Sequence, residues 1–221
     1  MEMEQLETQI KNQFEIYQEQ GLRLFASSSF QTHSLPMLHL ISRYAPETPV
    51  LFINTGFHFP ETLIFRDRIA NAFGLHVVDV KSDVPKNLQR DIDGQFYFTS
   101  EPDYCCFLNK TQPLTQAMGE YDVWINGIRK DQNANRRSMQ FEARTPEGKL
   151  RYHPMLDWNS KLIFQYRKKH QLPEHPLEKQ GYFSVGCEPC TRKYDADNNR
   201  DGRWFGSKKT ECGLHTDLVQ K

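Results

Sequence analysis

Leu22-Arg23-Leu24-Phe25-Ala26-Ser27-Ser28-Ser29 begins as a mainly apolar run and ends in small polar residues. The run over 22–26 predicts a short buried strand, and the serines after it predict a turn. Apolar residues around 36–41 then predict a helix. A strand that leads through a polar turn into a helix is the first unit of an α/β fold.

The same alternation continues along the chain. Leu6, Ile10, Phe14 and Tyr17 recur at helical spacing, which predicts a helix over residues 3–19 that stops at Gly21. Further helices are predicted at 60–73 and 159–170, further strands at 49–53, 76–80 and 121–125, and a hairpin around the turn 145–149. This pattern predicts an α/β fold with a mostly parallel twisted sheet flanked by helices.

Length and composition exclude several function classes. A chain of 221 residues favours a single α/β domain. Its 28 Lys plus Arg balance 28 Asp plus Glu, so the chain lacks the excess of positive charge that would indicate nucleic acid or a membrane surface as partner. No apolar run approaches the ~20 residues that span a bilayer, and the acidic start lacks the features of a secretory signal. Five cysteines, an odd number, indicate cytoplasmic thiols in metal or redox work.

Four of these cysteines form two pairs, Cys105-Cys106 and the Cys187 and Cys190 of Cys-Glu-Pro-Cys. Together they offer four soft ligands. Adjacent side chains reach one tetrahedral zinc with difficulty, but they can serve two different irons of a four-iron cube. We therefore rank a [4Fe–4S] cluster first, zinc second and ordinary buried thiols third.

The fifth cysteine, Cys212, follows two lysines and precedes His215 near the C-terminus. Positive neighbours lower the pKa of a thiol and increase its thiolate fraction, so Cys212 is the predicted nucleophile; an incidental exposed thiol is the alternative. The residues before it are polar and poor in aliphatics. We predict an α/β nucleotide- and cluster-binding domain over 1–190 and a mobile C-terminal segment over 191–221.

The turn after the first strand is also a candidate anion site. Hydroxyl and backbone N–H groups that precede a helix bind phosphates, although serines also serve as plain helix caps. The loop 27–34 contains no Lys and no Asp, which a loop handling Mg-ATP would be expected to supply. Lys110 is either a surface lysine or a charge that compensates the thiolates. Other candidate anion-binding groups are Arg129, Lys130, Arg136, Arg137, Arg200 and Arg203.

These residues together resemble one family, the assimilatory adenylyl-sulfate reductases, which are grouped with the phosphoadenylyl-sulfate reductases. The matching pieces span almost the whole chain. They are Ser27-Ser28-Ser29-Phe30, Asn54-Thr55-Gly56, Pro60-Glu61-Thr62, Cys105-Cys106, Gly127-Ile128-Arg129-Lys130, Gly186-Cys187-Glu188-Pro189-Cys190-Thr191-Arg192, Arg200-Asp201-Gly202-Arg203-Trp204 and Glu211-Cys212-Gly213-Leu214-His215.

The resemblance implies an adenine nucleotide α-hydrolase-like fold of the HUP or PP-loop type. It also implies a two-step reaction of sulfate assimilation and cysteine biosynthesis. The Cys212 thiolate would attack the sulfur of adenosine 5′-phosphosulfate (APS) and expel AMP, which leaves an S-sulfocysteine. A thiolate of thioredoxin or glutaredoxin would then attack the sulfur of Cys212 and release sulfite.

The resemblance also assigns roles to residues. It implies that the cluster contributes electrostatics and organisation rather than carrying electrons, and that His215 positions or activates Cys212. Lys110, Arg200 and Arg203 would face the sulfate and Arg129 the phosphate. The implied cluster ligands are Cys105, Cys106, Cys187 and Cys190, and the implied nucleotide contacts are Ser27, Ser28, Ser29, Phe30, Asn54, Thr55 and Gly56.

Members of the family with both cysteine pairs tend to use APS, so APS is the expected substrate. Use of the 3′-phosphorylated form (PAPS), alone or with APS, is the alternative. Assembly into a homo-oligomer is also possible on the sequence alone. Two rival functions remain open. One is a nucleotide pyrophosphatase or thiolation enzyme of the same fold with a structural zinc; the other is a zinc- or iron–sulfur-binding redox sensor without turnover.

Overall fold

The computed structural model describes residues 2–182, 184–193 and 214. Four residues predicted to act in the reaction lie outside the described residues: Cys212, His215, Arg200 and Arg203. Most of the predicted segment 191–221 lies outside them as well.

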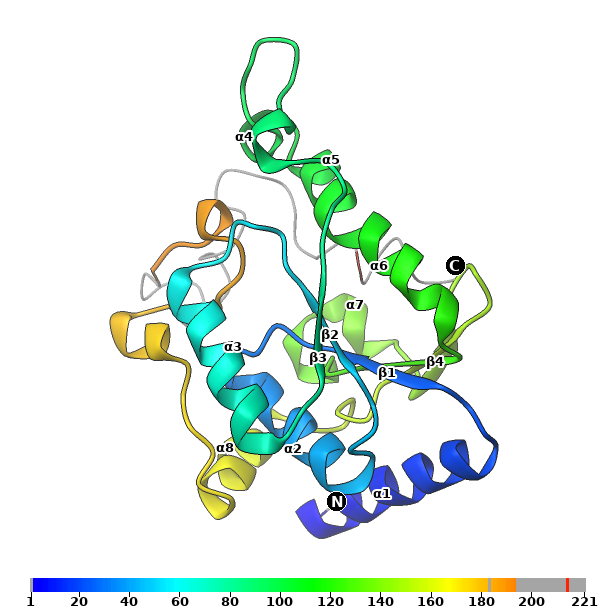
Figure 1. The fold of residues 1–221 in the computed structure, drawn as a ribbon. Helices are drawn as coiled ribbons and strands as arrows, with labels where there is room; N and C mark the ends of the chain where they lie inside the picture. The colour runs from blue at the N-terminus through cyan, green and yellow to red at the C-terminus, as the bar shows by residue number, and fades with distance from the viewer. Residues whose placement is uncertain (1, 183, 194–213, 215–221) are drawn as a thin grey trace.

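Six strands form one sheet, in the order β3-β2-β1-β4-β6-β5 (Figure 1). Neighbouring strands are parallel except for β5 and β6, which form the predicted antiparallel hairpin. The mostly parallel sheet is therefore confirmed. The strands are β1 Leu24–Ser27, β2 Val50–Ile53, β3 Val77–Val80, β4 Val123–Asn126, β5 Glu142–Arg144 and β6 Leu150–Tyr152.

The long helices begin and end close to the predicted positions. Pro60 occupies the first turn of its helix, where a missing N–H costs nothing, and Asn159 caps another by accepting from Leu162 N at 2.9 Å. The helices are α1 Met3–Glu19, α2 Leu35–Tyr44, α3 Pro60–Phe73, α4 Tyr97–Ser100, α5 Pro102–Cys106, α6 Gln112–Ala117, α7 Ala134–Arg137 and α8 Ser160–Lys169.

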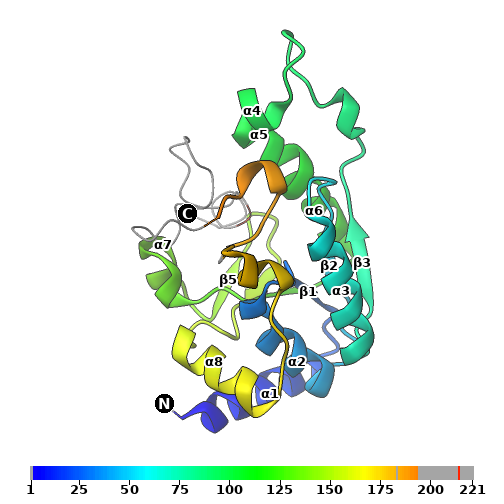
Figure 2. The ribbon, with the colours of Figure 1, turned by 90° about the vertical axis from the view of Figure 1, so that its left-hand side faces the viewer.

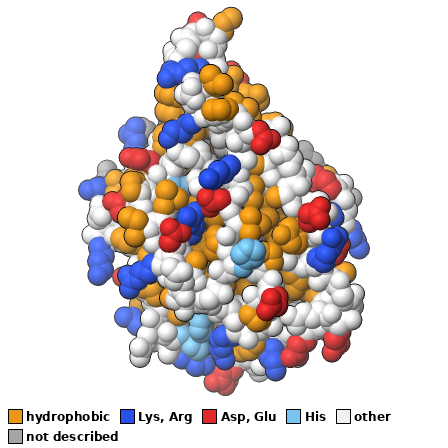
Figure 3. Space-filling model, viewed as in Figure 1, with side chains coloured by type: hydrophobic (Ala, Val, Ile, Leu, Met, Phe, Trp, Pro, Cys, Tyr) orange, Lys and Arg blue, Asp and Glu red, His pale blue; other side chains and the backbone are white. Residues whose placement is uncertain are grey.

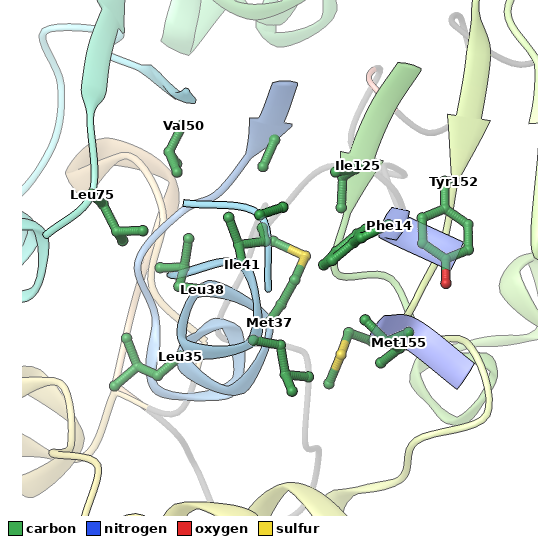
Figure 4. Packing of buried hydrophobic residues seen from close by; sticks show 14 of the residues in the cluster. Phe14, Leu35, Met37, Leu38, Ile41, Val50, Leu75, Ile125, Tyr152 and Met155 are labelled. Atoms are coloured by element: carbon green, nitrogen blue, oxygen red, sulfur yellow. The ribbon is translucent and has the colours of Figure 1, made fainter. Parts of the chain in front are cut away.

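Alternate residues of each strand enter two different cores, because successive side chains of a strand point to opposite faces. Ala26, Val50 and Ile125 face the larger core, which α1, α2, α3 and α8 complete (Figure 4). Phe25 and Trp124 face the smaller core on the opposite side, where residues of α6 and its C-terminal end pack. α1, α2 and α8 lie together at the end of the molecule opposite the region of α4 (Figure 2).

The connections place a topological switch point between β1 and β4. From β1 the chain continues to β2 and β3 on one side of the sheet, and then returns to β4 on the other side. β1 and β4 pair in parallel with Ser27 opposite Asn126, so the carboxyl ends of both strands meet there. Ligands of open α/β sheets bind in the crevice at this kind of position.

Two regions differ from the sequence prediction. The first strand begins at Leu24 instead of Leu22, because the Asp122 carboxylate accepts from the backbone N–H and the guanidinium of Arg23. No element was predicted between residues 81 and 120. There, an arm (residues 81–101) extends from the body and leads into a helical rod formed by α5, a π-helical turn Phe107–Thr111 and α6 (Figure 1).

Among the helices of the described residues, none combines the length and apolar character needed to cross a membrane.

Candidate active site

The four paired cysteines converge on one pocket, although the two pairs are about 80 residues apart in sequence. Cys105 and Cys106 end α5, while Cys187 and Cys190 lie on a turn near the end of the described chain. Cys105, Cys106 and Cys187 are buried, and Cys190 is half-buried. Phe57 packs against Cys105 and Cys187, which gives the pocket an apolar wall.

A network of hydrogen bonds shapes the turn that carries Cys187 and Cys190. Cys190 N donates to Cys187 O at 3.0 Å, and the Thr191 hydroxyl donates to the same carbonyl at 2.8 Å. That hydroxyl also accepts from Gly186 N at 3.1 Å. The turn is fixed to the loop after β2, because Glu188 N donates to Phe57 O at 2.7 Å.

Three polar side chains contact sulfur atoms in this pocket. The Thr55 hydroxyl lies 3.3 Å from Cys187 Sγ, and Lys110 Nζ donates to Cys106 Sγ at 3.6 Å. Asn109 Nδ2 lies 3.6 Å from Cys105 Sγ. Of the two interpretations of Lys110, the geometry therefore favours a charge beside the thiols.

The surroundings of Cys105 within the protein oppose thiolate formation at this residue. Burial, together with the nearby Cys106 and Cys187, raises the pKa of the Cys105 thiol to about 12. The Lys110 ammonium acts in the opposite direction. Bound metal would deprotonate such thiols, since its positive charge favours the thiolate.

The serine turn after β1 is held by its own side chains. Ser27 Oγ accepts from Trp124 Nε1 at 2.7 Å, and Ser28 Oγ accepts from Phe30 N at 3.1 Å. Phe30 has φ +53°, in the left-handed region, and its buried ring contacts Phe52. Ser29 is exposed at the apex. The serine bond reverses the chain so that Phe30 enters the core.

Gln31 joins this turn to the segment before the second cysteine pair. Its side-chain oxygen accepts from Val185 N at 3.2 Å, and its amide nitrogen bonds to Val185 O. The predicted phosphate turn and the cysteine pocket are thus parts of one continuous region, which the sequence separation of 154 residues does not reveal.

Arg129 lies at the same edge of the sheet and is buried. Its Nε donates to Asp131 at 2.9 Å, and Asp131 in turn accepts from Ser160 N at the start of α8. Burial, together with the nearby Arg129 guanidinium, lowers the pKa of His33 to about 4. This electrostatic effect indicates that Arg129 lies near His33 of the loop 27–34.

The other basic candidates after β4 have varied environments. Arg136 is buried on α7, where its guanidinium donates to Gln132, and Arg137 is exposed on the same helix. Lys130 is half-buried and donates to Asp157 at 2.7 Å.

The side chains of Asn54 and Thr55 and the backbone of Gly56 have hydrogen-bond partners within the protein. Asn54 donates to Asp79 at 2.8 Å and accepts from Gly56 N at 3.2 Å. Gly56 has φ +72°, and its carbonyl accepts from Lys86 Nζ at 2.6 Å. The nucleotide contacts assigned to these three residues stay predictions.

Asn126, a buried polar residue, was missed by the sequence analysis. It ends β4 at the switch point, is 3% exposed, and neither polar atom of its carboxamide has a hydrogen-bond partner among the described residues. The available signal was a polar residue directly after the predicted strand 121–125, at the edge where ligands bind. Gln89 and Asn109, buried beside the cysteine pocket, gave no such signal.

Comparisons with known proteins agree on one family. The family described as "Phosphoadenosine phosphosulfate reductase domain" matches residues 23–193. Adenosine 5′-phosphosulfate reductase of Halalkalibacterium halodurans is 35% identical over 202 residues, covering 90% of this chain and 87% of the relative. Phosphoadenosine 5′-phosphosulfate reductase of Gloeobacter violaceus is also 35% identical, covering 88% of this chain and 83% of the relative.

Solved structures show the same fold. Phosphoadenylyl-sulfate reductase from Candida auris has a TM-score of 0.62 and 23% identity, covering 75% of this chain and 81% of that one. Candida glabrata FMN adenylyltransferase has a TM-score of 0.63 and 14% identity, covering 99% of this chain and 74% of that one. The predicted adenine nucleotide α-hydrolase-like fold is confirmed.

Proposed function

The chain belongs to the phosphoadenosine phosphosulfate reductase family, and on this basis we propose that it reduces APS to sulfite and AMP. The match to family and relatives extends over most of the chain, so it includes both the sheet and the cysteine pocket. An oxidoreductase acting on APS accounts for a phosphate-type turn beside a set of thiols.

Convergence of four cysteines on one pocket is the observation that carries the proposal. We propose that Cys105, Cys106, Cys187 and Cys190 hold a [4Fe–4S] cluster. Within the described residues, no group of three or more His, Cys, Asp or Glu side chains is placed to hold a single metal ion. All four cysteines nevertheless line one pocket, and four thiolates are the usual ligand set of such a cluster. Bound there, the cluster would supply fixed charge and organisation beside Lys110.

The reaction itself takes place at sulfur. The Cys212 thiolate attacks the sulfur of APS, the bond from that sulfur to the phosphate oxygen breaks, and AMP leaves with the electron pair. The product is an S-sulfocysteine. A dithiol protein of the thioredoxin class then attacks the sulfur of Cys212, releases sulfite, and becomes a disulfide as it supplies two electrons.

Residues of the described fold would bind and orient the nucleotide. Backbone groups of the turn 27–30 and the Arg129 guanidinium lie at the crevice where a phosphate would bind. Lys110, at the edge of the cysteine pocket, would offset the negative charge of the sulfate. Asn126 would offer a donor and an acceptor to the nucleoside.

Intact-protein mass spectrometry tests this proposal. Cluster-loaded protein is incubated anaerobically with APS, or with PAPS in parallel, without any reducing thiol. We expect a sulfonate mass increase that maps to Cys212 and is absent from the Cys212→Ser variant. The nucleotide that forms the adduct faster is the preferred substrate.

If neither nucleotide forms an adduct with protein whose iron content is intact, the covalent mechanism is contradicted. An adduct on a different cysteine would assign the nucleophile elsewhere. Release of sulfite on later addition of reduced thioredoxin, but not of oxidised thioredoxin, would establish the second step.

A further inference from the structure

The arm and the start of the rod have almost no apolar core of their own. The structure describes all of residues 81–104, and Gln89 is the one residue among them that is buried. Leu88 and Ile92 are 63% and 100% exposed, and apolar atoms lie at the tip of the arm (Figure 3). The one buried side chain of the arm is therefore polar, and it contacts the rod.

Gln89 forms a reciprocal pair with Asn109 of the π-helical turn. Gln89 Nε2 donates to Asn109 Oδ1 at 2.9 Å, and Asn109 Nδ2 donates to Gln89 Oε1 at 2.6 Å. The two side chains are 3% and 2% exposed. Two hydrogen bonds between buried amides satisfy groups that would otherwise be costly to bury.

Further contacts fix the orientation of both amides. Gln89 Nε2 also donates to Val84 O at 2.9 Å, which identifies the nitrogen end of this side chain. Asn109 Nδ2 also donates to Cys105 O at 3.0 Å, which does the same for Asn109. Turning either amide over would place two acceptors or two donors against each other.

The Asn109 amide nitrogen also lies 3.6 Å from Cys105 Sγ, within range of an N–H···S hydrogen bond. Asn109 belongs to a π-helical turn, in which backbone N–H groups bond to carbonyls five residues back instead of four. One N–H of the Asn109 amide donates to Gln89, so the other is shared between the carbonyl and the sulfur of Cys105, the residue four positions earlier, as a three-centre bond. π-turns of this kind occur often at functional sites.

We propose that the Gln89–Asn109 pair is a positioning element for the cluster: Gln89 holds Asn109 so that its amide donates to the Cys105 sulfur. The inference rests on the proposed cluster. A donor to a ligating thiolate stabilises its negative charge and fixes the orientation of the ligand, as the groups around metal ligands commonly do. Through Val84 and Gln89, the base of the arm becomes part of the support of a ligand.

A plain mechanical role is the competing explanation. The pair would then hold the arm against the rod without any effect on Cys105. The two roles make different predictions, because only the first alters how fast the cluster loses iron. Partners that orient metal ligands typically change metal affinity about 10–100-fold when they are removed.

The test compares three variants with the wild-type protein, each loaded with its cluster. Asn109→Leu removes the donor to sulfur at similar size, and Gln89→Met removes the group that holds Asn109. Asn87→Ala is the matched control, an exposed amide on the same arm. Iron release to an excess of chelator is followed anaerobically by the visible absorbance of the cluster, and thermal unfolding checks each fold.

We expect iron release to be about tenfold faster or more in Asn109→Leu, about threefold or more in Gln89→Met, and within twofold of wild type in Asn87→Ala. If Asn109→Leu does not fold, the Gln89→Met result alone decides the inference. Release as slow as in wild type, with faster proteolysis of the arm, would overturn it in favour of the mechanical role.

The iron and acid-labile sulfide content of the wild-type protein separates the two levels of the argument. Wild-type protein that takes up neither would overturn the proposed cluster and this inference with it. Wild-type protein that is loaded with iron, beside variants that lose iron at the same rate, would overturn only the role of the pair.

Discussion

Burial of the Asn126 carboxamide costs free energy of folding unless a ligand forms hydrogen bonds with it. Leaving a buried donor or acceptor without a partner costs about 1–3 kcal/mol, and within the described part of the chain both polar atoms of this carboxamide lack one. The cost falls at the switch point of the sheet, opposite Ser27. A carboxamide presents one donor and one acceptor side by side, which suits the edge of an adenine or a pair of ribose hydroxyls.

We predict that Asn126→Leu lowers the affinity for AMP about tenfold or more without loss of stability. The polar contact to the nucleoside disappears, but so does the buried unsatisfied amide, so the melting temperature should stay equal or rise. Isothermal titration with AMP and thermal unfolding measure the two effects.

Asn54→Leu provides the contrast, because that carboxamide is bonded to Asp79 and Gly56 and its loss should cost about 1 kcal/mol. Unchanged AMP affinity in Asn126→Leu would exclude a nucleotide contact at this position. Comparison of AMP with IMP and with 3′-deoxy-AMP would show whether base or ribose is the group contacted.

Individual residues differ in how far the sequence can predict their roles. The four paired cysteines could be singled out because thiols in such spacing are rare and have few structural uses. Asn126, Gln89 and Asn109 could not, because an amide is common on surfaces and only its three-dimensional partners decide its role. For Asn54 the structure shows one partner at each end of the amide, Asp79 and Gly56, and its predicted nucleotide contact stays a prediction.

At the level of elements, the turn 186–191 determines how two of the proposed ligands are presented. It depends on one hydroxyl: Thr191 Oγ1 donates to Cys187 O and accepts from Gly186 N. Thr191 is buried, so water does not easily replace either bond.

We predict that Thr191→Val destabilises the fold by about 1–2 kcal/mol, since both hydrogen bonds are lost at nearly constant shape. Iron release to a chelator should accelerate as well, because the turn then holds Cys187 and Cys190 less firmly. Urea unfolding and chelator kinetics measure these effects. Thr191→Ser keeps the hydroxyl and should behave nearly as wild type; a Ser variant as labile as the Val variant would assign the effect to the methyl group.

Helical periodicity identified the long helices but not the rod at residues 102–117. Pro102 and Pro113 fall within it, and a proline in a sequence normally indicates a break. Each of these prolines occupies the first turn of a short helix, where it is tolerated. The π-helical turn between the two helices also shifts the apolar spacing. The rod was therefore not predicted, although the pair Cys105-Cys106 lies on it.

At the scale of the whole molecule, several histidines are buried in a neutral state. Burial is the main cause, and nearby positive groups add to it: together they lower the pKa to about 4 for each of His33, His39 and His153. In the unfolded chain these side chains titrate near pH 6.5. Between about pH 6.5 and 4 the unfolded state therefore binds protons that the folded state does not.

Stability should consequently fall as the pH falls through this window, because the unfolded state binds more protons. His153 is well suited to a test. Its Nδ1 donates to Gln140 O at 2.7 Å, and its buried Nε2 has no partner among residues 2–182 and 184–193, so a second proton would be disfavoured there by burial and by Arg151 and Arg136.

We predict that His153→Asn, whose amide can keep the bond to Gln140, has a shallower dependence of stability on pH. Each proton taken up on unfolding contributes a slope of about 1.4 kcal/mol per pH unit, so the two proteins should differ by up to this amount per unit. Urea unfolding of both proteins at pH 7.5, 6.5, 5.5 and 4.5 gives the free energy of unfolding at each pH, and its slope reports the protons bound on unfolding. Because acid also weakens metal–thiolate bonds in both proteins, the difference between them isolates His153. Parallel curves would mean that His153 is protonated in the folded protein, and burial would then not be what governs its pKa.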